Sequence, residues 1–295
     1  MIAIGLEGGY ICLVDADTGE IKWKVHAHDS PHTSVAISPD GRWIASVGMA
    51  CRQWKLWNSI DGTLSMAVPS HDGHGECTCG TAGPILEFLC PLLPMKGHLA
   101  VKFSPCNSWV ACGSRDGNIA LWDIRTEVPQ LHWHLETASK QFDSLSFSRD
   151  GSLIACGGYQ AKTYIVDVET GTLRQSWKSH AGGTFSPINN NHLATGTEYA
   201  VSLWDVERET IIWTQTAGHA YQEAGNFAAF SPDGLTIATV SQPTPDEDSD
   251  QDDESTDEPP RITLIDATTG DVKQMLVHEW SLRVWDSTFS VSPYI

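Results

Sequence analysis

Short runs of apolar residues recur along the chain, and each run is bounded by residues that favour turns. Examples are 43–48 (WIASVG), 109–114 (WVACGS) and 153–158 (LIACGG), which are rich in small, aromatic and β-branched side chains. Runs of this length and composition are typical of strands. Asp-Gly pairs stand before two of them, at 40–41 and 150–151, and these residues tolerate the geometry of tight turns. The pattern predicts an all-β chain of short strands joined by tight turns.

The strand pattern repeats with a nearly constant internal spacing. One anchor is an apolar residue followed by Ser, and the other is the polar residue that ends a later apolar strand. The anchor pairs are Ile37 and Asn58, Phe103 and Asp123, Phe147 and Asp167, Phe185 and Asp205, and Phe230 and Asp266. Four of the separations are 20 or 21 residues, and the last is 36 because an acidic segment lies inside it. Four short strands in about 40 residues are the sequence signature of one propeller blade.

The repeat resembles that of the WD-repeat β-propeller family. The residues that carry the resemblance are the pairs 122–123 and 204–205 (Trp-Asp), the Ser-Pro-Asp-Gly turns, and His28 ahead of the first such turn. The resemblance covers nearly all of the chain outside two inserts. It implies a β-propeller of four-stranded antiparallel blades, and it is specific for fold rather than for function.

The family pattern also implies a buried polar set in each copy, made of a His, a hydroxyl residue, a turn Asp and the Trp. The copy with His98, Ser114, Asp116 and Trp122 comes closest to this set. The copy that ends at Trp57 has no matching turn Asp. We therefore expect apolar packing between blades to dominate over buried polar networks.

The two ends of the chain are expected to complete one blade together. Residues 2–25 supply a second, third and fourth strand without a first, and residues 284–293 (VWDSTFSVSP) read as a first strand with nothing after it. Pairing them would remove exposed sheet edges. The prediction is a single domain over 1–295 with six blades, or seven if the chain is a fragment of a longer protein.

Two inserts interrupt the repeat. The insert at 69–95 lies between blades and contains His71, His74, Cys77 and Cys79. These residue types bind Zn²⁺, but their spacing is a poor match to structural zinc sites, and the glycines around them fit a plain loop equally well. We predict no metal site there. The second insert, 243–260, is strongly acidic and has no aromatic residue, so we expect a disordered loop.

Composition narrows the class of partner and the compartment. The formal net charge is −19 and the isoelectric point is near 4.8, which argues against a nucleic-acid partner because phosphate binding needs clustered Lys and Arg. No apolar stretch is long enough to span a bilayer.

Cys12, Cys112 and Cys156 sit in apolar strand-like runs, which indicates buried, reduced thiols. We expect a cytoplasmic protein, with the nucleus as an alternative.

The candidate binding residues lie in the short turns between second and third strands. They carry residue types that are enriched at interface hot spots. The candidates are Arg52, Trp54, Arg115, Tyr159 and Lys162. Basic residues stand out on an acidic protein and could recognise an acidic peptide, although exposed turns carry polar residues in any case. The outer-strand tryptophans, by contrast, are expected to pack blades together.

The sequence contains no nucleophile, metalloprotease or phosphate-loop motif, so no catalytic residue and no cofactor is assigned. This favours a non-enzymatic scaffold that presents propeller loops to protein partners, within a larger complex. The alternative is a pyrroloquinoline quinone-dependent dehydrogenase, because 15–23 (DADTGEIKW) is similar to the repeat of those enzymes. In that repeat a Trp after a Thr-Gly turn docks neighbouring blades.

Overall fold

The structure is a computed structural model, and it describes the greater part of the chain. The described residues are 1–30, 33–49, 53–69, 98–126, 128–137, 142, 144–158, 162–178, 182–197, 200–216, 228–241 and 261–277. Their regular secondary structure consists of strands alone, so none of them forms a helix that could cross a membrane. Most of the insert at 69–95, the acidic segment and residues 284–293 lie outside the described residues.

The strands form six antiparallel sheets within the described residues. In the first sheet, β1 (Ile2–Leu6), β2 (Tyr10–Val14) and β3 (Ile21–His26) lie side by side. The second and third sheets are β4 (Thr33–Ile37), β5 (Trp43–Gly48), β6 (Gln53–Asn58) and β7 (Leu64–Pro69), and then β8 (His98–Phe103), β9 (Trp109–Ser114), β10 (Asn118–Asp123) and β11 (Gln130–Glu136). The fourth and fifth are β12 (Ser144–Phe147), β13 (Leu153–Gly157), β14 (Lys162–Asp167) and β15 (Leu173–Lys178), and then β16 (Gly183–Phe185), β17 (His192–Gly196), β18 (Ala200–Asp205) and β19 (Thr210–Thr216). The sixth is β20 (Ala228–Phe230), β21 (Thr236–Ser241), β22 (Arg261–Asp266) and β23 (Val272–Val277).

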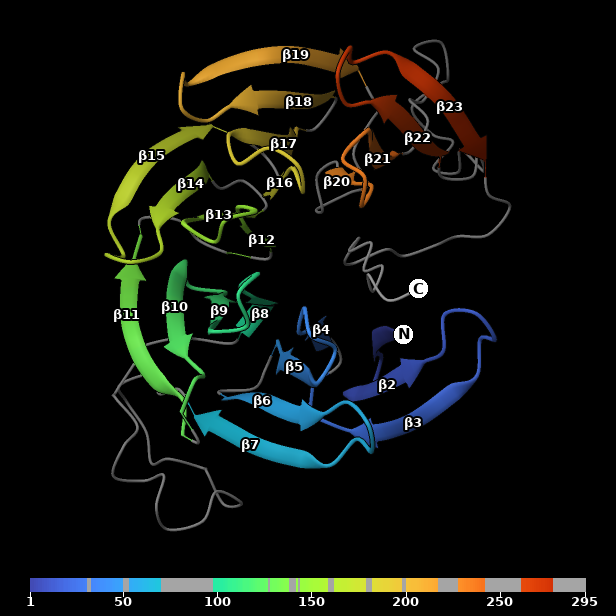
Figure 1. The fold of residues 1–295 in the computed structure, drawn as a ribbon, viewed down its shortest axis with the longest axis vertical. Coiled ribbons are helices and arrows are strands. Elements are labelled where there is room, and N and C mark those ends of the chain that lie inside the picture. Colours follow the sequence, from blue (N-terminus) through green and yellow to red (C-terminus); the bar gives the residue numbers. More distant parts are fainter. Residues whose placement is uncertain are drawn as a thin grey trace, which may run out of the picture.

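The sheets follow one another around a ring in chain order (Figure 1). Each four-stranded sheet has its first strand nearest the centre and its fourth strand at the outside. Neighbouring inner strands pack together, as β4 does with β8 and β12 does with β16. This arrangement confirms the predicted propeller of four-stranded antiparallel blades. In the first sheet, β1 to β3 take the places of second to fourth strands, as predicted, and the pairing of residues 284–293 with β1 stays a prediction.

The alternating strand directions divide the loops between two faces of the ring. The turn face carries the turns between first and second strands and between third and fourth strands. The insert face carries the turns between second and third strands and the connections from one sheet to the next. Both inserts begin and end on the insert face: β7 ends at Pro69 and β8 begins at His98, while β21 ends at Ser241 and β22 begins at Arg261.

The Ser-Pro-Asp-Gly turns are stabilised by hydrogen bonds of their own side chains and by the backbone freedom of glycine. In the first such turn, the Ser38 hydroxyl donates to the Asp40 carboxylate at 2.6 Å and accepts the backbone N–H of Trp43 at 2.9 Å. Gly41 has a φ of 72°, which glycine adopts without strain. In the related Ser-Arg-Asp-Gly turn at 148–151, the Ser148 hydroxyl likewise donates to the Asp150 carboxylate, at 2.7 Å. The turn-face loops are therefore held by their own side chains.

Outer-strand tryptophans join neighbouring sheets, as predicted. The indole N–H of Trp23 donates to the carbonyl of Ser59 at 2.9 Å, and that of Trp133 donates to the carbonyl of Val168 at 2.7 Å. Trp213 makes the same contact with Ala267 at 3.1 Å. Each indole lies over a glycine of the next sheet's turn, in the three pairs Trp23 and Gly62, Trp133 and Gly171, and Trp213 and Gly270.

The junction after the fourth sheet departs from this pattern. Gln175 stands at the usual tryptophan position, opposite Ile165, and Trp177 lies two residues later. The facing turn carries Glu209, with a φ of 57°, where the others carry glycine. The Gln175 amide donates to the Glu209 carboxylate at 2.9 Å, while Trp177 stacks on Trp204 with ring centroids 4.9 Å apart. A polar contact and a ring stack thus replace the indole-over-glycine contact.

The buried polar sets differ from the sequence expectation. In the second sheet the Ser46 hydroxyl accepts the indole N–H of Trp57 at 2.8 Å and lies 2.8 Å from Nε2 of His28. In the third sheet the Ser114 hydroxyl bonds to Asp116, but the indole N–H of Trp122 is buried without a hydrogen-bond partner among the residues that the structure describes. The most developed set among the described residues is therefore in the copy that ends at Trp57.

Candidate functional site

Two of the predicted binding residues are exposed on the insert face. Arg115 is exposed in the turn between β9 and β10, and Lys162 is exposed at the start of β14 in the next sheet. Arg52 and Tyr159 lie outside the described residues. The structure thus brings two of the predicted cations to the same face of adjacent sheets.

The turn that presents Arg115 is closely held. The Ser114 hydroxyl accepts the backbone N–H of Asn118 at 3.1 Å, and Gly117 has a φ of 77°. The carbonyl of Ser114 accepts the backbone N–H of Phe142 at 2.9 Å, which ties the turn to the connection into the next sheet. Fixed turns of this kind lower the entropy lost when a partner binds. Arg115 is therefore exposed on a rigid support.

Trp54 does not occupy an exposed turn. Strand β6 begins at Gln53, so Trp54 lies inside the sheet, and its side chain is fully buried. It packs against Trp122 of the next sheet, with ring centroids 6.1 Å apart. The prediction of a rim position is wrong for this residue, because the strand already begins at Gln53 and directs the indole inward.

Basic side chains of the insert face come from several sheets. Arg261 begins β22 on this face, beside the end of the acidic segment 243–260 in the sequence. Lys55 of β6 reaches the carbonyl of Ala27 at 2.7 Å and is committed to that contact. Arg115 and Lys162 remain the exposed pair. Acidic side chains, including Glu7 and Asp29, share the face, so its charge is mixed.

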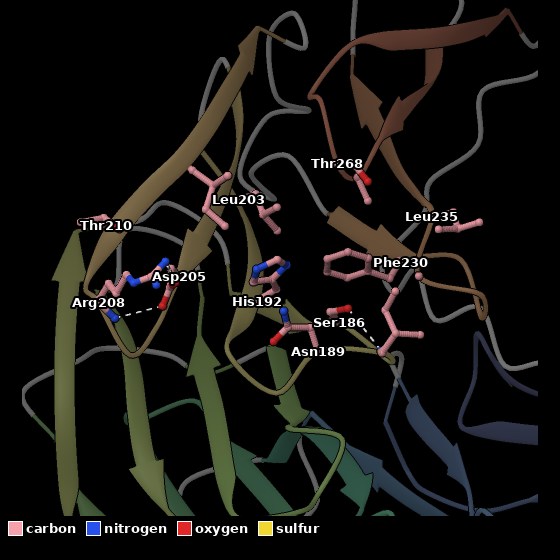
Figure 2. A pocket seen from close by; sticks show the side chains of 14 residues that line it. Ser186, Asn189, His192, Leu203, Asp205, Arg208, Thr210, Phe230, Leu235 and Thr268 are labelled. Carbon is pink, nitrogen blue, oxygen red and sulfur yellow. Dashed lines mark hydrogen bonds and ion pairs between the residues drawn. The ribbon is translucent and has the colours of Figure 1, made fainter.

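A hollow opens on the turn face at the junction of the fifth and sixth sheets (Figure 2). Its volume is about 510 Å³. Figure 2 shows His192 and Asn189 on the side of the fifth sheet and Phe230 and Leu235 on the side of the sixth. The floor is apolar, because Leu203 and Phe230 are buried in the core between these sheets.

The hollow has two structural causes. In the second and third sheets the first residue of the second strand is Trp43 or Trp109, and each indole packs against the core shared with the next sheet. His192 takes this position in the fifth sheet, opposite Asp205, and its smaller ring leaves space. The turn before it is also one residue longer, since Phe185 pairs with Leu193 eight positions on, whereas the other first-to-second-strand turns span seven. Sequence reasoning missed the hollow, although that extra residue was a visible signal.

The charges at the hollow are unequally exposed. The Asp205 side chain is largely buried and accepts the backbone N–H of Arg208 at 3.0 Å, whereas the Arg208 side chain is 80% exposed, with Nη1 3.4 Å from the carboxylate. The carboxylate of Glu207 on the same turn accepts the amide of Asn191 at 2.6 Å. The turn therefore uses its carboxylates internally and presents a guanidinium to solvent.

The described residues contain no group of three or more His, Cys, Asp or Glu side chains that could hold a metal ion. His71, His74, Cys77 and Cys79 lie outside them. Cys12, Cys112 and Cys156 are buried, as predicted, and burial raises the pKa of the Cys112 and Cys156 thiols. These two thiols therefore stay protonated and unreactive near neutral pH.

Comparison with known proteins identifies the repeat. Residues 19–58 and 90–123 match the family model described as "WD domain, G-beta repeat". A guanine nucleotide-binding protein subunit beta-like protein of Encephalitozoon cuniculi is 29% identical over 156 residues, which are 43% of this chain and 43% of that protein.

Two further relatives extend the comparison. A periodic tryptophan protein 2 homolog of Dictyostelium discoideum is 25% identical over 190 residues, which are 62% of this chain and 18% of that protein. A nuclear distribution protein PAC1 of Arthroderma benhamiae is 32% identical over 116 residues, which are 38% and 24% of the two chains. The matches thus span less than half the length of these relatives. None of them supports the quinone-dependent dehydrogenase alternative.

Proposed function

Since this chain belongs to the WD-repeat family of β-propeller proteins, we propose that it is a non-enzymatic interaction scaffold that presents its loops to peptide or protein partners. The observation that carries the proposal is the exposed pair Arg115 and Lys162, held on adjacent sheets of a closely packed ring. Recognition commonly resides in loops that a stable frame positions. Such a function needs shape and surface charge but no cofactor.

The insert face is the proposed contact surface. Arg115 lies in a turn between second and third strands on this face, and Lys162 begins the third strand of the next sheet. Arg52 and Tyr159 stand between second and third strands in the sequence, and all four are residue types that anchor interfaces. Two exposed cations on an otherwise acidic protein favour an acidic segment of the partner, because opposite charges steer association and disfavour other partners. The acidic segment 243–260 is attached to the same face, and its charge would oppose the approach of such a partner by repulsion.

We propose that the chain works within a larger protein complex in the cytoplasm, with the nucleus as an alternative. One relative is named for its likeness to the beta subunit of a guanine nucleotide-binding protein, which fits membership of an assembly. The low content of basic residues supports a protein rather than a nucleic-acid partner.

Affinity purification from the native source tests this function. The native chain should recover a partner in stoichiometric amount, and the double variant R115E/K162E should lose most of it. R42E is the matched control, because the Arg42 side chain is 79% exposed on the turn face, so it should retain the partner. Recovery of the native chain alone under gentle, low-salt conditions would contradict the scaffold function. Equal recovery by R115E/K162E would contradict the assignment of the contact to these two cations.

A comparison of the chain with and without residues 243–260 completes the experiment. If the acidic segment repels an acidic partner, its removal should increase the association rate, and the difference should shrink as salt rises. A decrease in the association rate on removal would contradict this role.

A further inference from the structure

We propose that the hollow between the fifth and sixth sheets is a second docking site, which binds a short peptide segment with an aliphatic side chain near an acidic one. The hollow lies on the turn face, opposite the contact surface proposed above, so the inference goes beyond that function. It would allow the ring to hold a linear segment on one face while the other face contacts a partner.

The aliphatic half of the assignment follows from the rim of the hollow. Ile188 is 50% exposed, Leu235 53% and Ile212 44%, and the three come from different segments around one opening. Isolated exposed aliphatic residues are common on protein surfaces, but a group that surrounds a concave apolar floor marks a binding site. Leu203 and Phe230 supply that floor. An inserted aliphatic side chain would remove several partly exposed apolar surfaces from water at once.

The rim is also well supported. Ile188 lies against Gly234 of the next sheet, so closely that a Cβ at Gly234 would fall 2.6 Å from its Cγ1. The backbone carbonyl of Leu235 accepts the ammonium of Lys273 at 2.9 Å. Ile188 is therefore held across the junction, and the backbone of Leu235 is tied to β23 of its own sheet. A preformed site of this kind loses less entropy on binding.

The acidic half of the assignment follows from the unequal exposure of the charges. Asp205 is buried and is satisfied within its own turn, while Arg208 presents most of its guanidinium at the mouth of the hollow. Glu207 is bonded to Asn191 and lies outside the lining. The charged group that an incoming segment meets at this mouth is therefore a cation, and planar guanidinium groups pair well with carboxylates.

The remaining lining suits a peptide backbone. Asn189 and His192 lie on one side, and the hydroxyl of Thr268 lies on the other. A small number of polar groups around an apolar floor fixes the orientation of a bound segment. The volume of about 510 Å³ is suited to a few side chains of a linear segment rather than to a folded domain.

Selection of random linear peptides displayed on phage, with the full chain as the target, tests the proposal. Enriched peptides should share a Leu, Ile, Val or Phe within a few positions of an Asp or Glu. A fluorescein-labelled peptide of the consensus should then bind by fluorescence polarisation, with affinity about tenfold weaker in L235D and in I188D, since each removes apolar contact worth about 1.4 kcal/mol. R208E should weaken binding, and added salt should narrow its difference from the native chain.

Matched controls separate a local effect from a damaged fold. I60D changes an aliphatic residue that is 86% exposed on the turn face of another sheet, and R42E reverses an exposed cation elsewhere on that face, so both should bind the peptide normally. Melting curves of all variants should stay close to that of the native chain. A library without enrichment, a consensus that lacks acidic or aliphatic residues, or equal binding by L235D and I60D would overturn the proposal. The peptide assay requires no native partner, so its failure is distinct from failure of the scaffold function.

Discussion

Substitution of Gly171 by alanine measures how much the tryptophan contacts stabilise the ring. Gly171 has a φ of 69°, and a Cβ there would lie 2.7 Å from Cγ of Trp133 and 2.9 Å from its Cδ2. The ring of Trp133 would have to move, and its N–H would leave the carbonyl of Val168, now 2.7 Å away. The substitution therefore acts at the junction of two sheets as well as on the backbone of one turn.

The control is Gly19→Ala in the corresponding turn of the first sheet. Gly19 has a φ of 74°, and nothing lies within 4 Å of a Cβ placed there. Both variants incur the cost of a left-handed alanine, about 1 kcal/mol. G171A adds overpacking of about 1–3 kcal/mol and the loss of one hydrogen bond, about 1 kcal/mol. The free energy of unfolding should therefore fall by about 2–4 kcal/mol more in G171A than in G19A.

Differential scanning calorimetry provides the assay. At about 2 °C per kcal/mol for a chain of this size, G171A should melt about 4–8 °C below G19A. In a background of Trp133→Phe, which shortens the ring and removes the N–H, the difference should shrink, because contacting residues are not additive. Equal melting temperatures for G171A and G19A would refute the view that the indole-over-glycine contact stabilises the junction.

Three further predictions concern individual side chains. Ser46→Ala leaves the buried indole N–H of Trp57 without its acceptor, now 2.8 Å away, so unfolding should need about 1–3 kcal/mol less; an unchanged melting curve would contradict this. Iodoacetamide should modify exposed Cys106 well before the buried cysteines of β9 and β13, as measured by peptide mass spectrometry. Hydrogen bonds from the backbone N–H of Thr18, the Lys22 side chain and the backbone N–H of Asp17 together lower the pKa of Asp15 from 3.8 to about 2. The stabilising effect of the ionised carboxylate is present above pH 3.8 and is lost as the pH falls through 2, so Asp15→Asn should flatten acid unfolding in that window.

The fold could be predicted from the sequence because its signals are local and repeated. The spacing between anchors such as Phe147 and Asp167 spans the first three strands of one sheet, and the same spacing recurs in copy after copy. The three strands of the first sheet were also evident, since three strand-like runs stand ahead of Asp29. Repetition makes the inference robust, because an error in one copy is corrected by the others.

The site was less predictable, because it depends on single positions. The sequence pattern places Trp54 in a turn, yet β6 begins at Gln53 and its indole lies in the core rather than on the rim. The polar set was expected around Ser114, but the orientation of side chains, which the sequence does not show, favoured Ser46. The hollow arose where His192 replaced a tryptophan and a turn gained one residue, and only the structure shows that the neighbouring sheet leaves that space open.

The separation of loops between two faces has a consequence for how the ring can vary. Turn-face loops are short and are tied by serine, aspartate and glycine to their own strands, and several also receive a tryptophan from the adjacent sheet. A change of length there disturbs two sheets at once, whereas the opposite side already accommodates long stretches between Pro69 and His98 and between Ser241 and Arg261. Foreign sequences or reporter domains should therefore be grafted at those two positions, where the scaffold tolerates added length without loss of its packing.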